Sequence, residues 1–431
     1  MRVIRCSSIV VAALTENESR ETSHFLVLPM RPLDGITVVS LEQAVAAPFA
    51  SRHLADLGAR VIKIERPQVG DFARDYDQTV NGLSSHFVWL NRSKESLALD
   101  VKHAKAKEIL DKLIARADVF IQNLAPGAAR RLGLSAEELL SEHPRLIVCD
   151  ISGYGDSGPY ASKKAYDLLV QSEAGVLSVT GTPETPSKVG ISIADIATGV
   201  YAYSGILAAL LQREKTGKGG RVEVTMLEAL GEWMSYPLYY THFSGAAPPR
   251  TGPDHATIVP YGRYLTGDGK SVMLGLQNER EWTAFCDKVL GQPKLAADRR
   301  YDSNSKRNER RGEILAIIDK VFSTLTTEQL IEKLDAAGIA NAHINSPAEV
   351  WNHEQFRARD RWREMGSPKG KLPALLPPAT HDGFEARMDA VPEVGEHTES
   401  ILLELGLTNE KIAELKSAAA ISFERRKPPQ K

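Results

Sequence analysis

The stretch from Thr37 to Glu65 constrains the fold more than any other part of the sequence. Residues 37–41 and 60–65 are short apolar runs, and residues 48–57 between them carry a helical pattern. Proline in the first turn, here Pro48, and glycine just past the last turn, here Gly58, are typical helix boundaries. A strand, a helix and a strand in this order lie with the two strands parallel in one sheet. We therefore predict an α/β fold.

The same alternation continues to about residue 226 and predicts an open, Rossmann-like parallel sheet. Further strands are predicted at residues 119–123, 145–151 and 221–226. Further helices are predicted at residues 102–115, 164–175 and 195–215. The first unit lacks a GxGxxG motif, which disfavours ordinary dinucleotide binding. In such a sheet ligands bind beyond the carboxyl ends of the strands, where the loops after Leu41, Glu65, Asn123 and Ile151 lie.

Length and local composition predict two domains. A chain of 431 residues exceeds one ordinary core, and residues 244–252 form a linker-like stretch. We predict a large domain at 30–244, a smaller α+β domain at 245–335, and a segment at 336–431 that returns to the large domain. Residues 1–29 are an N-terminal extension that arises from an upstream start codon or is a weak targeting sequence.

Composition limits the classes of binding partner and the cellular compartments that we expect. A formal net charge of -2 with 25% charged residues gives no case for nucleic acid or an anionic membrane as a partner. The apolar run from Ile196 to Leu211 is shorter than a membrane span requires and is predicted to be a buried helix. Cys6, Cys149 and Cys286 lack disulfide or zinc spacing, which favours a cytoplasmic location or an organelle matrix.

Asp195 is the acidic residue that opens the most apolar helical run of the chain. An aspartate at a helix start is most often an N-cap, which accepts hydrogen bonds from free backbone N–H groups. The alternative is a carboxylate that takes part in catalysis. The local pattern favours the cap and leaves catalysis open.

An ordered series of motifs resembles the class III CoA-transferases, the CaiB/BaiF group that includes formyl-CoA and carnitine CoA-transferases. The matching segments are residues 32–39 (PLDGITVV), 47–48, 57–67 (LGARVIKIERP), 91–100 (NRSKESLALD), 123–127, 152–155, 165–167, 194–195, 215–219 and 395–398. The resemblance implies a homodimer of interlocked rings, a Rossmann-like large domain and a small domain. It implies no metal and no permanently bound cofactor, with coenzyme A entering as an acyl-CoA substrate.

The resemblance makes Asp195 the nucleophile, because the family places an aspartate a short distance after a Thr-Gly turn, here Thr180-Gly181. Its carboxylate would attack the donor thioester and form an anhydride, and the CoA thiolate would then form an aspartyl-CoA thioester. A reference pKa near 3.9 and the helix N-terminus favour the ionised form that this attack needs. Glu184 is the nearest rival carboxylate, but a Pro-Glu-Thr-Pro turn is typical of a solvated loop.

The resemblance also assigns coenzyme A contacts. These are expected at Val45, Ala46, Arg66, Leu99, Lys102, Asn123, Leu124, Ala125, Arg131 and Lys164. Arginine pairs with phosphate or stacks on adenine, which suits Arg66. Taken singly, each basic residue is also typical of a solvated surface.

Asp167 distinguishes the transferases from the related α-methylacyl-CoA racemases, the alternative function. The racemase branch has a histidine just before this position, because proton transfer on both faces of a carbon needs two groups. Tyr166 stands there instead, and no histidine occurs between His143 and His242. Asp167 is expected either to form a local hydrogen bond or cap, or to act beside the nucleophile at the substrate site.

Acceptor specificity is expected from residues 255–263 of the small domain, which the family places near the active site. Tyr261 and Arg263 are the candidate substrate contacts, with Arg250 as a second arginine. A guanidinium binds a carboxylate bidentately, which suggests a short dicarboxylate such as succinate, malate, itaconate or mesaconate. The glycine run that formyl-CoA transferases carry here is absent, which disfavours oxalate.

Overall fold

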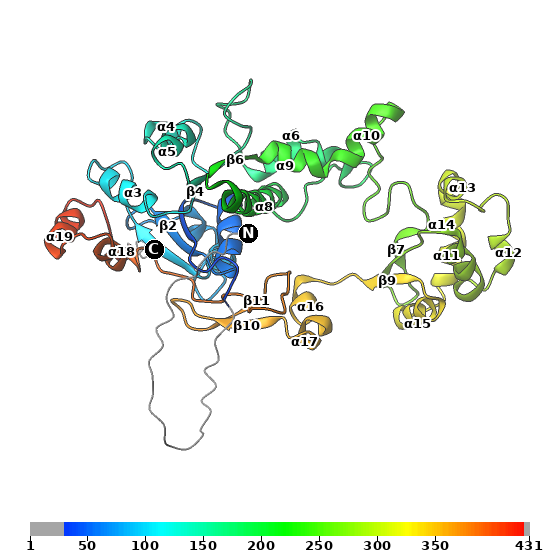
Figure 1. Ribbon diagram of the computed structural model, residues 1–431. Helices are drawn as coiled ribbons and strands as arrows, with labels where there is room; N and C mark the ends of the chain where they lie inside the picture. Colours follow the sequence, from blue (N-terminus) through cyan, green and yellow to red (C-terminus); the bar gives the residue numbers. More distant parts are fainter. Residues whose placement is uncertain (1–29, 426–431) are drawn as a thin grey trace, which may run out of the picture.

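A six-stranded parallel sheet forms the centre of the large domain in the computed structural model, which describes residues 30–425 (Figure 1). Its order is β3-β2-β1-β4-β5-β6, and every neighbouring pair is parallel. The strands are β1 (Thr37–Leu41), β2 (Arg60–Glu65), β3 (Lys94–Ala98), β4 (Val119–Gln122), β5 (Ile147–Ser152) and β6 (Gly220–Thr225). This is the order of a Rossmann-like sheet, so the predicted α/β class and parallel sheet are confirmed. The predicted N-terminal extension lies outside the described residues.

Helices cover both faces of this sheet. One face packs with an apolar core against α3 (Ala106–Ile114), α5 (Ala136–Glu142), α18 (Thr398–Glu404) and α19 (Asn409–Ser417). The other face packs against α1 (Ala46–Asp56) and α8 (Ile193–Thr216). Within the described chain α8 alone is long and apolar enough for a membrane span, yet it packs against α1, β5 and β6. Because α18 and α19 pack on this sheet, the last part of the described chain lies on the large domain.

β3 is a strand that the sequence pattern did not predict. Its residues read KESLA, and both Lys94 and Ser96 are buried rather than facing solvent. Their partners are charged groups of β2 and of the loop after β1, so polarity here does not mark an exposed face. The hydrophobic alternation that indicates a half-buried strand is therefore absent from the sequence.

The remaining elements of the large domain lie along the chain between β2 and the linker. They are η1 (Phe72–Asp75), α2 (Ser85–Leu90), α4 (Ala128–Arg131), α6 (Asp167–Glu173), α7 (Val176–Val179), α9 (Met226–Trp233) and α10 (Ser235–Ser244). α6 and α9 pack beside α8. They form a small apolar cluster with the start of α8.

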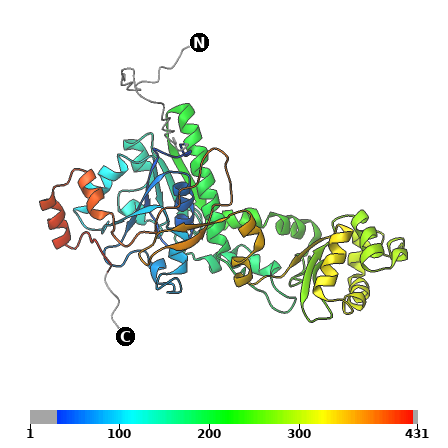
Figure 2. The same ribbon diagram turned by 90° about the horizontal axis from the view of Figure 1, so that it is seen from below.

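A second body lies apart from the large domain, joined to it by two chain segments (Figures 1 and 2). Its antiparallel sheet contains β7 (Tyr261–Leu265), β8 (Ser271–Gly275) and β9 (Ala340–His343). Its helices are α11 (Glu279–Ala284), η2 (Phe285–Val289), α12 (Pro293–Ala296), α13 (Asn304–Glu309), α14 (Arg311–Phe322) and α15 (Thr327–Ala337). β9 extends this body past residue 335, where the sequence pattern placed the boundary.

The returning segment begins with α16 (Pro347–Trp351) and α17 (Glu354–Ala358). A two-stranded ribbon of β10 (Trp362–Met365) and β11 (Leu372–Leu375) follows, before the chain reaches α18 and α19.

Candidate active site

Asp195 lies in the first turn of α8 but does not cap it. The helix begins at Ile193 after the N-cap residue Ser192, whose side chain makes no capping hydrogen bond. Asp195 is therefore the third helical residue, and the local prediction of an N-cap at this position is wrong. The physical reason is that the free N–H groups of this helix find their acceptor on another helix.

That acceptor is Asp167, the first residue of α6. Its Oδ1 accepts hydrogen bonds from the backbone N–H of Ala194 at 2.8 Å and of Asp195 at 3.4 Å. Its Oδ2 accepts a hydrogen bond from Gln171 Nε2 at 2.7 Å. Asp167 thus caps α8 from a distant part of the sequence, and it lies beside Asp195. Substrate contact by Asp167 remains a prediction.

The Asp195 carboxylate also meets the start of α1. The backbone N–H of Ala46, the first residue of that helix, faces this carboxylate and lowers its pKa. Gly199 permits this approach, because a Cβ there would lie 2.8 Å from the Ala46 carbonyl oxygen. Asp195 therefore lies in the first turn of α8 and at the N-terminus of α1, and helix N-termini stabilise anions.

Burial and the neighbouring Asp167 carboxylate raise the pKa of Asp195 to about 7, although the Ala46 N–H partly opposes the shift. The reference value used for the sequence-based expectation is thus too low for this site. Desolvation and a like charge both disfavour an ionised carboxylate. Asp195 is a partly exposed carboxylate that ionises near neutral pH and is more basic than an ordinary aspartate.

Tyr76 and Tyr166 are aromatic neighbours, and the sequence analysis did not single out Tyr76. Burial and the charges of Asp71 and Asp195 raise the pKa of Tyr76 to about 12, and Tyr166 contributes as well. Tyr76 is 48% exposed and Tyr166 67% exposed, so both phenol rings border the solvent side of the site. Tyr76 follows a polar segment with no periodic pattern, and only the fold brings it to Asp195.

The loop after β1 places Val45 and Ala46 beside α8, and both residues are buried. The Asn123 side chain holds this loop: its Oδ1 accepts from the Gln43 N–H at 2.9 Å, and its Nδ2 donates to the Gln43 carbonyl at 2.8 Å. The predicted contacts after β1 and β4 therefore meet at the carboxyl edge of the sheet. This is the edge where open α/β sheets bind ligands.

Further predicted coenzyme A contacts gather at the same edge. Arg66, Leu99 and Leu124 line a narrow cleft of about 60 Å³. Leu124 and Ala125 also line a wider cavity of about 620 Å³ beyond β4 and β5. Within the described chain the one hydrogen bond of the Arg66 side chain goes to the Gly70 carbonyl, at 3.3 Å. Its guanidinium is otherwise available to a phosphate.

The other predicted basic contacts are exposed on the surface. Lys102, Arg131 and Lys164 all face solvent. The Arg131 guanidinium folds back over Gly127, where a Cβ would lie 3.0 Å from it. Lys164 precedes the capping residue Asp167 by three positions. Their role toward coenzyme A stays a prediction.

The predicted acceptor contacts are not brought to Asp195 within one chain. Tyr261 and Arg263 lie on β7 in the separate small body (Figure 1). Arg250, from the segment that leaves α10, donates hydrogen bonds to the carbonyl groups of Ser178, Thr182 and Pro183. Within one chain its guanidinium is thus held by carbonyl groups of residues 178–183, and contact with an acceptor stays a prediction.

Glu184 lies at the exposed tip of a tight loop. The loop is closed by hydrogen bonds between Thr182 and Thr185 in both directions. Glu184 is thus a solvated residue, as its Pro-Glu-Thr-Pro setting indicates.

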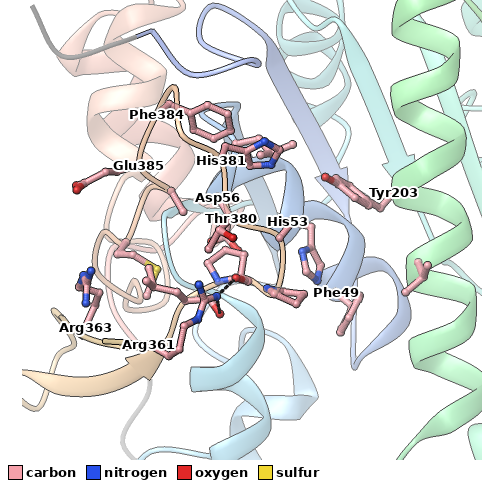
Figure 3. Close-up of a pocket in the computed structure, with 18 of the residues that line it drawn as sticks. Phe49, His53, Asp56, Tyr203, Arg361, Arg363, Thr380, His381, Phe384 and Glu385 are labelled. Carbon is pink, nitrogen blue, oxygen red and sulfur yellow. Dashed lines mark hydrogen bonds between the residues drawn. The ribbon is translucent and has the colours of Figure 1, made fainter. Parts of the chain in front are cut away.

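A third cavity, of about 500 Å³, lies along the later turns of α1 (Figure 3). Phe49, His53 and Tyr203 form one wall, and residues 376–388 form another. Burial and the charges of Arg52 and Arg92 lower the pKa of His53 to about 3, so its ring is neutral. None of the predicted catalytic or coenzyme A residues lines this cavity. Among residues 30–425 there is also no group of three or more His, Cys, Asp or Glu side chains suited to a metal ion.

Comparison with known proteins identifies the family. The profile of CoA-transferase family III matches residues 33–398. The chain is 33% identical over 380 residues to succinyl-CoA:glutarate CoA-transferase of Mus musculus, covering 87% of each chain. It is 35% identical over 340 residues to acetyl-CoA:oxalate CoA-transferase of Acetobacter aceti, covering 78% of this chain and 87% of the relative.

Among solved structures, a CAIB/BAIF family protein from Brucella suis superposes with a TM-score of 0.76 at 32% identity, covering 87% of this chain and 99% of that one. The resemblance inferred from the motifs is thus confirmed. The protein belongs to family III of the CoA-transferases and is a CoA-transferase.

Proposed function

We propose that this enzyme transfers coenzyme A from an acyl-CoA to a short dicarboxylic acid through covalent intermediates on Asp195. The observation that carries the proposal is the setting of Asp195: a partly exposed carboxylate at two helix N-termini with a pKa of about 7. A raised pKa makes the carboxylate a better nucleophile while leaving much of it ionised near neutral pH.

The reaction is a series of balanced acyl substitutions. A carboxylate oxygen of Asp195 attacks the thioester carbonyl carbon, the C–S bond breaks, and CoA leaves as a thiolate. The thiolate then attacks the Asp195 carbonyl carbon of the mixed anhydride, which releases the first acid. The acceptor carboxylate attacks the aspartyl thioester, and the returning thiolate gives the new acyl-CoA and restores Asp195. When the thiolate attacks the Asp195 carbonyl carbon, negative charge develops on the Asp195 carbonyl oxygen. This oxygen lies beside the Ala46 N–H, which can stabilise the charge.

Hydroxylamine trapping tests this proposal at a single residue. Trypsin cleavage after Lys188 and Arg213 gives a peptide of residues 189–213, in which Asp195 is the only carboxyl side chain. Asp167 and Glu184 fall in the preceding peptide, residues 165–188. Incubation with succinyl-CoA and then hydroxylamine should place a hydroxamate in peptide 189–213, detected by mass spectrometry.

A hydroxamate in peptide 165–188 would assign the nucleophile to another carboxylate. No adduct in either peptide, together with solvent deuterium entering the α-carbon of a branched acyl-CoA, would replace the proposal with the racemase reaction.

The dicarboxylate class rests on two supports. Arg263 is exposed on β7 and suits a second carboxylate. The names of the relatives include glutarate and oxalate as acceptors, both dicarboxylic acids. As acceptors of coenzyme A, we expect succinate, malate, itaconate, mesaconate and glutarate to react faster than oxalate. A panel of these acids assayed with succinyl-CoA, with isotope-labelled succinate to follow the exchange with succinate itself, tests the order, and a preference for monocarboxylic acids would refute it.

We further propose that the enzyme is a homodimer, in which a second copy covers α10 and brings a small body to Asp195. Tyr236, Leu238, Tyr239 and Phe243 on α10 are each at least 54% exposed, and the helix buries no residue within one chain. A large exposed apolar patch is typical of an interface. Light scattering after size exclusion should give twice the mass of one chain; a monomeric mass would contradict it.

Cys149 and Cys286 are free and buried, which supports a reducing compartment such as the cytoplasm or an organelle matrix.

A further inference from the structure

A buried cluster of charged groups lies beyond the carboxyl end of β1, where Glu42 and Asp71 meet Lys63 of β2 and Lys94, the first residue of β3. Lys63 Nζ donates to Asp71 Oδ2 at 2.8 Å and to Glu42 Oε1 at 3.3 Å, and Lys94 Nζ donates to Glu42 Oε1 at 2.7 Å. These four side chains are at most 3% exposed. Burying charges costs free energy even when they are paired, so a cluster of this size calls for a purpose besides stability.

Hydroxyl groups and a second ion pair complete the cluster. Ser40 and Ser51 donate to Glu42 Oε2 at 2.7 Å and 2.5 Å. Burial alone would raise the pKa of Glu42, but Lys94 and Lys63 hold it at about 2. Glu65 binds the Arg74 guanidinium and accepts a hydrogen bond from the Asp71 N–H at 2.8 Å. Asp71 is thus held rigidly from both sides.

Asp71 passes this rigidity to the loop after β1. Its Oδ1 accepts a hydrogen bond from the Ala44 N–H at 3.1 Å. Ala44 has a φ of 62°, a left-handed conformation that is unfavourable for a non-glycine residue and persists only when its surroundings impose it. Two residues further on, Ala46 packs against α8 at Gly199, and its N–H lowers the pKa of Asp195.

The same cluster forms the floor of the predicted coenzyme A cleft. Glu42, Glu65 and Asp71 line that cleft together with Arg66 and Leu99. The loop that carries Arg66 ends at Asp71, where it meets the cluster. One rigid group therefore borders both the coenzyme A contacts and the loop that reaches Asp195.

From these contacts we propose that Asp71 is a positioning residue: with Lys63, Glu42 and Lys94 it holds Ala44 in the left-handed conformation and so fixes the start of α1, with the Ala46 N–H, beside Asp195. The inference rests on the proposed role of Asp195 as nucleophile. It predicts that loosening Asp71 changes the reactivity of Asp195.

The titratable groups that face Asp195 set the background for a pH test. They are Asp167 from α6 and Tyr76 from the end of η1, with Tyr166 beside Tyr76. The Ala46 N–H lowers the pKa of Asp195, so moving this N–H away from the carboxylate should raise the pKa. Removing the Asp71 charge would instead lower that pKa by direct electrostatics. The direction of the change therefore separates the two effects.

Asp71→Asn tests the inference through the pH profile of kcat/KM in the full-length enzyme. We expect the acidic limb to move to higher pH and kcat to fall about tenfold or more, because a small misplacement of a catalytic contact has effects of this size. If Asp71→Asn is insoluble, Asp71→Glu serves, since it keeps the charge that Lys63 needs and moves only the carboxylate.

Asp56→Asn is the matched control. Asp56 is a buried carboxylate at the far end of α1, paired with Arg52 and Arg92. It should lower the thermal midpoint while leaving the acidic limb in place. An acidic limb in the Asp71 variants that is unmoved, or moved to lower pH, would overturn the inference. Hydroxylamine trapping in the wild type would then still support Asp195, so the two proposals fail separately.

Discussion

Replacing Asp195 with asparagine should remove activity and stabilise the fold at the same time. The wild-type carboxylate has a pKa of about 7 in the folded protein against an ordinary value of 3.8. The difference of about three units corresponds to at most about 4 kcal/mol, at 1.36 kcal/mol per unit. Because Asp195 keeps contact with solvent, we expect about half of this, or about 2 kcal/mol, as a gain for Asp195→Asn.

The sign of the pH dependence follows from the direction of the shift. Between about pH 4 and about pH 7 the folded wild type holds a proton on Asp195 that the unfolded chain has released. Its free energy of unfolding therefore falls as the pH rises through this window. Asp195→Asn cannot ionise, so its advantage should be absent below about pH 4 and complete above about pH 7.

Thermal or chemical unfolding at about pH 4 and about pH 8 measures this difference. Glu184→Gln is the control, because Glu184 is exposed at a loop tip and its replacement should change neither activity nor stability. The reasoning is refuted if Asp195→Asn is no more stable than the wild type at the higher pH. A gain that is equal at both pH values would also refute it, since the source would then not be ionisation.

Three further substitutions follow from the site geometry. Asp167→Asn keeps an acceptor for the Ala194 N–H but removes a like charge, so the acidic limb of kcat/KM should move down by up to about one pH unit; an unmoved limb would contradict this. Gly199→Ala should lower stability by about 1–3 kcal/mol and reduce kcat, because its Cβ would push the Ala46 carbonyl away; an unchanged thermal midpoint would count against it. Arg66→Ala should raise KM for acyl-CoA about tenfold with little change in kcat, and steady-state kinetics would show an unchanged KM if Arg66 makes no contact.

Local sequence patterns determined much of the fold. The apolar runs and helix boundaries around Pro48 and Gly58 predicted β1, α1 and β2, because alternation and helix stop signals act over a few residues. The position of Asp195 at the start of a long apolar helix was also legible in the sequence. Its assignment as nucleophile came from the resemblance, since the local pattern favoured a cap.

Only the tertiary structure decided which groups surround Asp195. Asp167 caps its helix from 28 residues away in the sequence, and Ala46 reaches it from the first helix of the chain. The strand that carries Lys94 was missed for the same reason, because its charges are buried against Glu42 and Lys63. Burial, pKa shifts and long-range hydrogen bonds depend on which residues are neighbours in space. The local periodicity of a sequence does not indicate those neighbours.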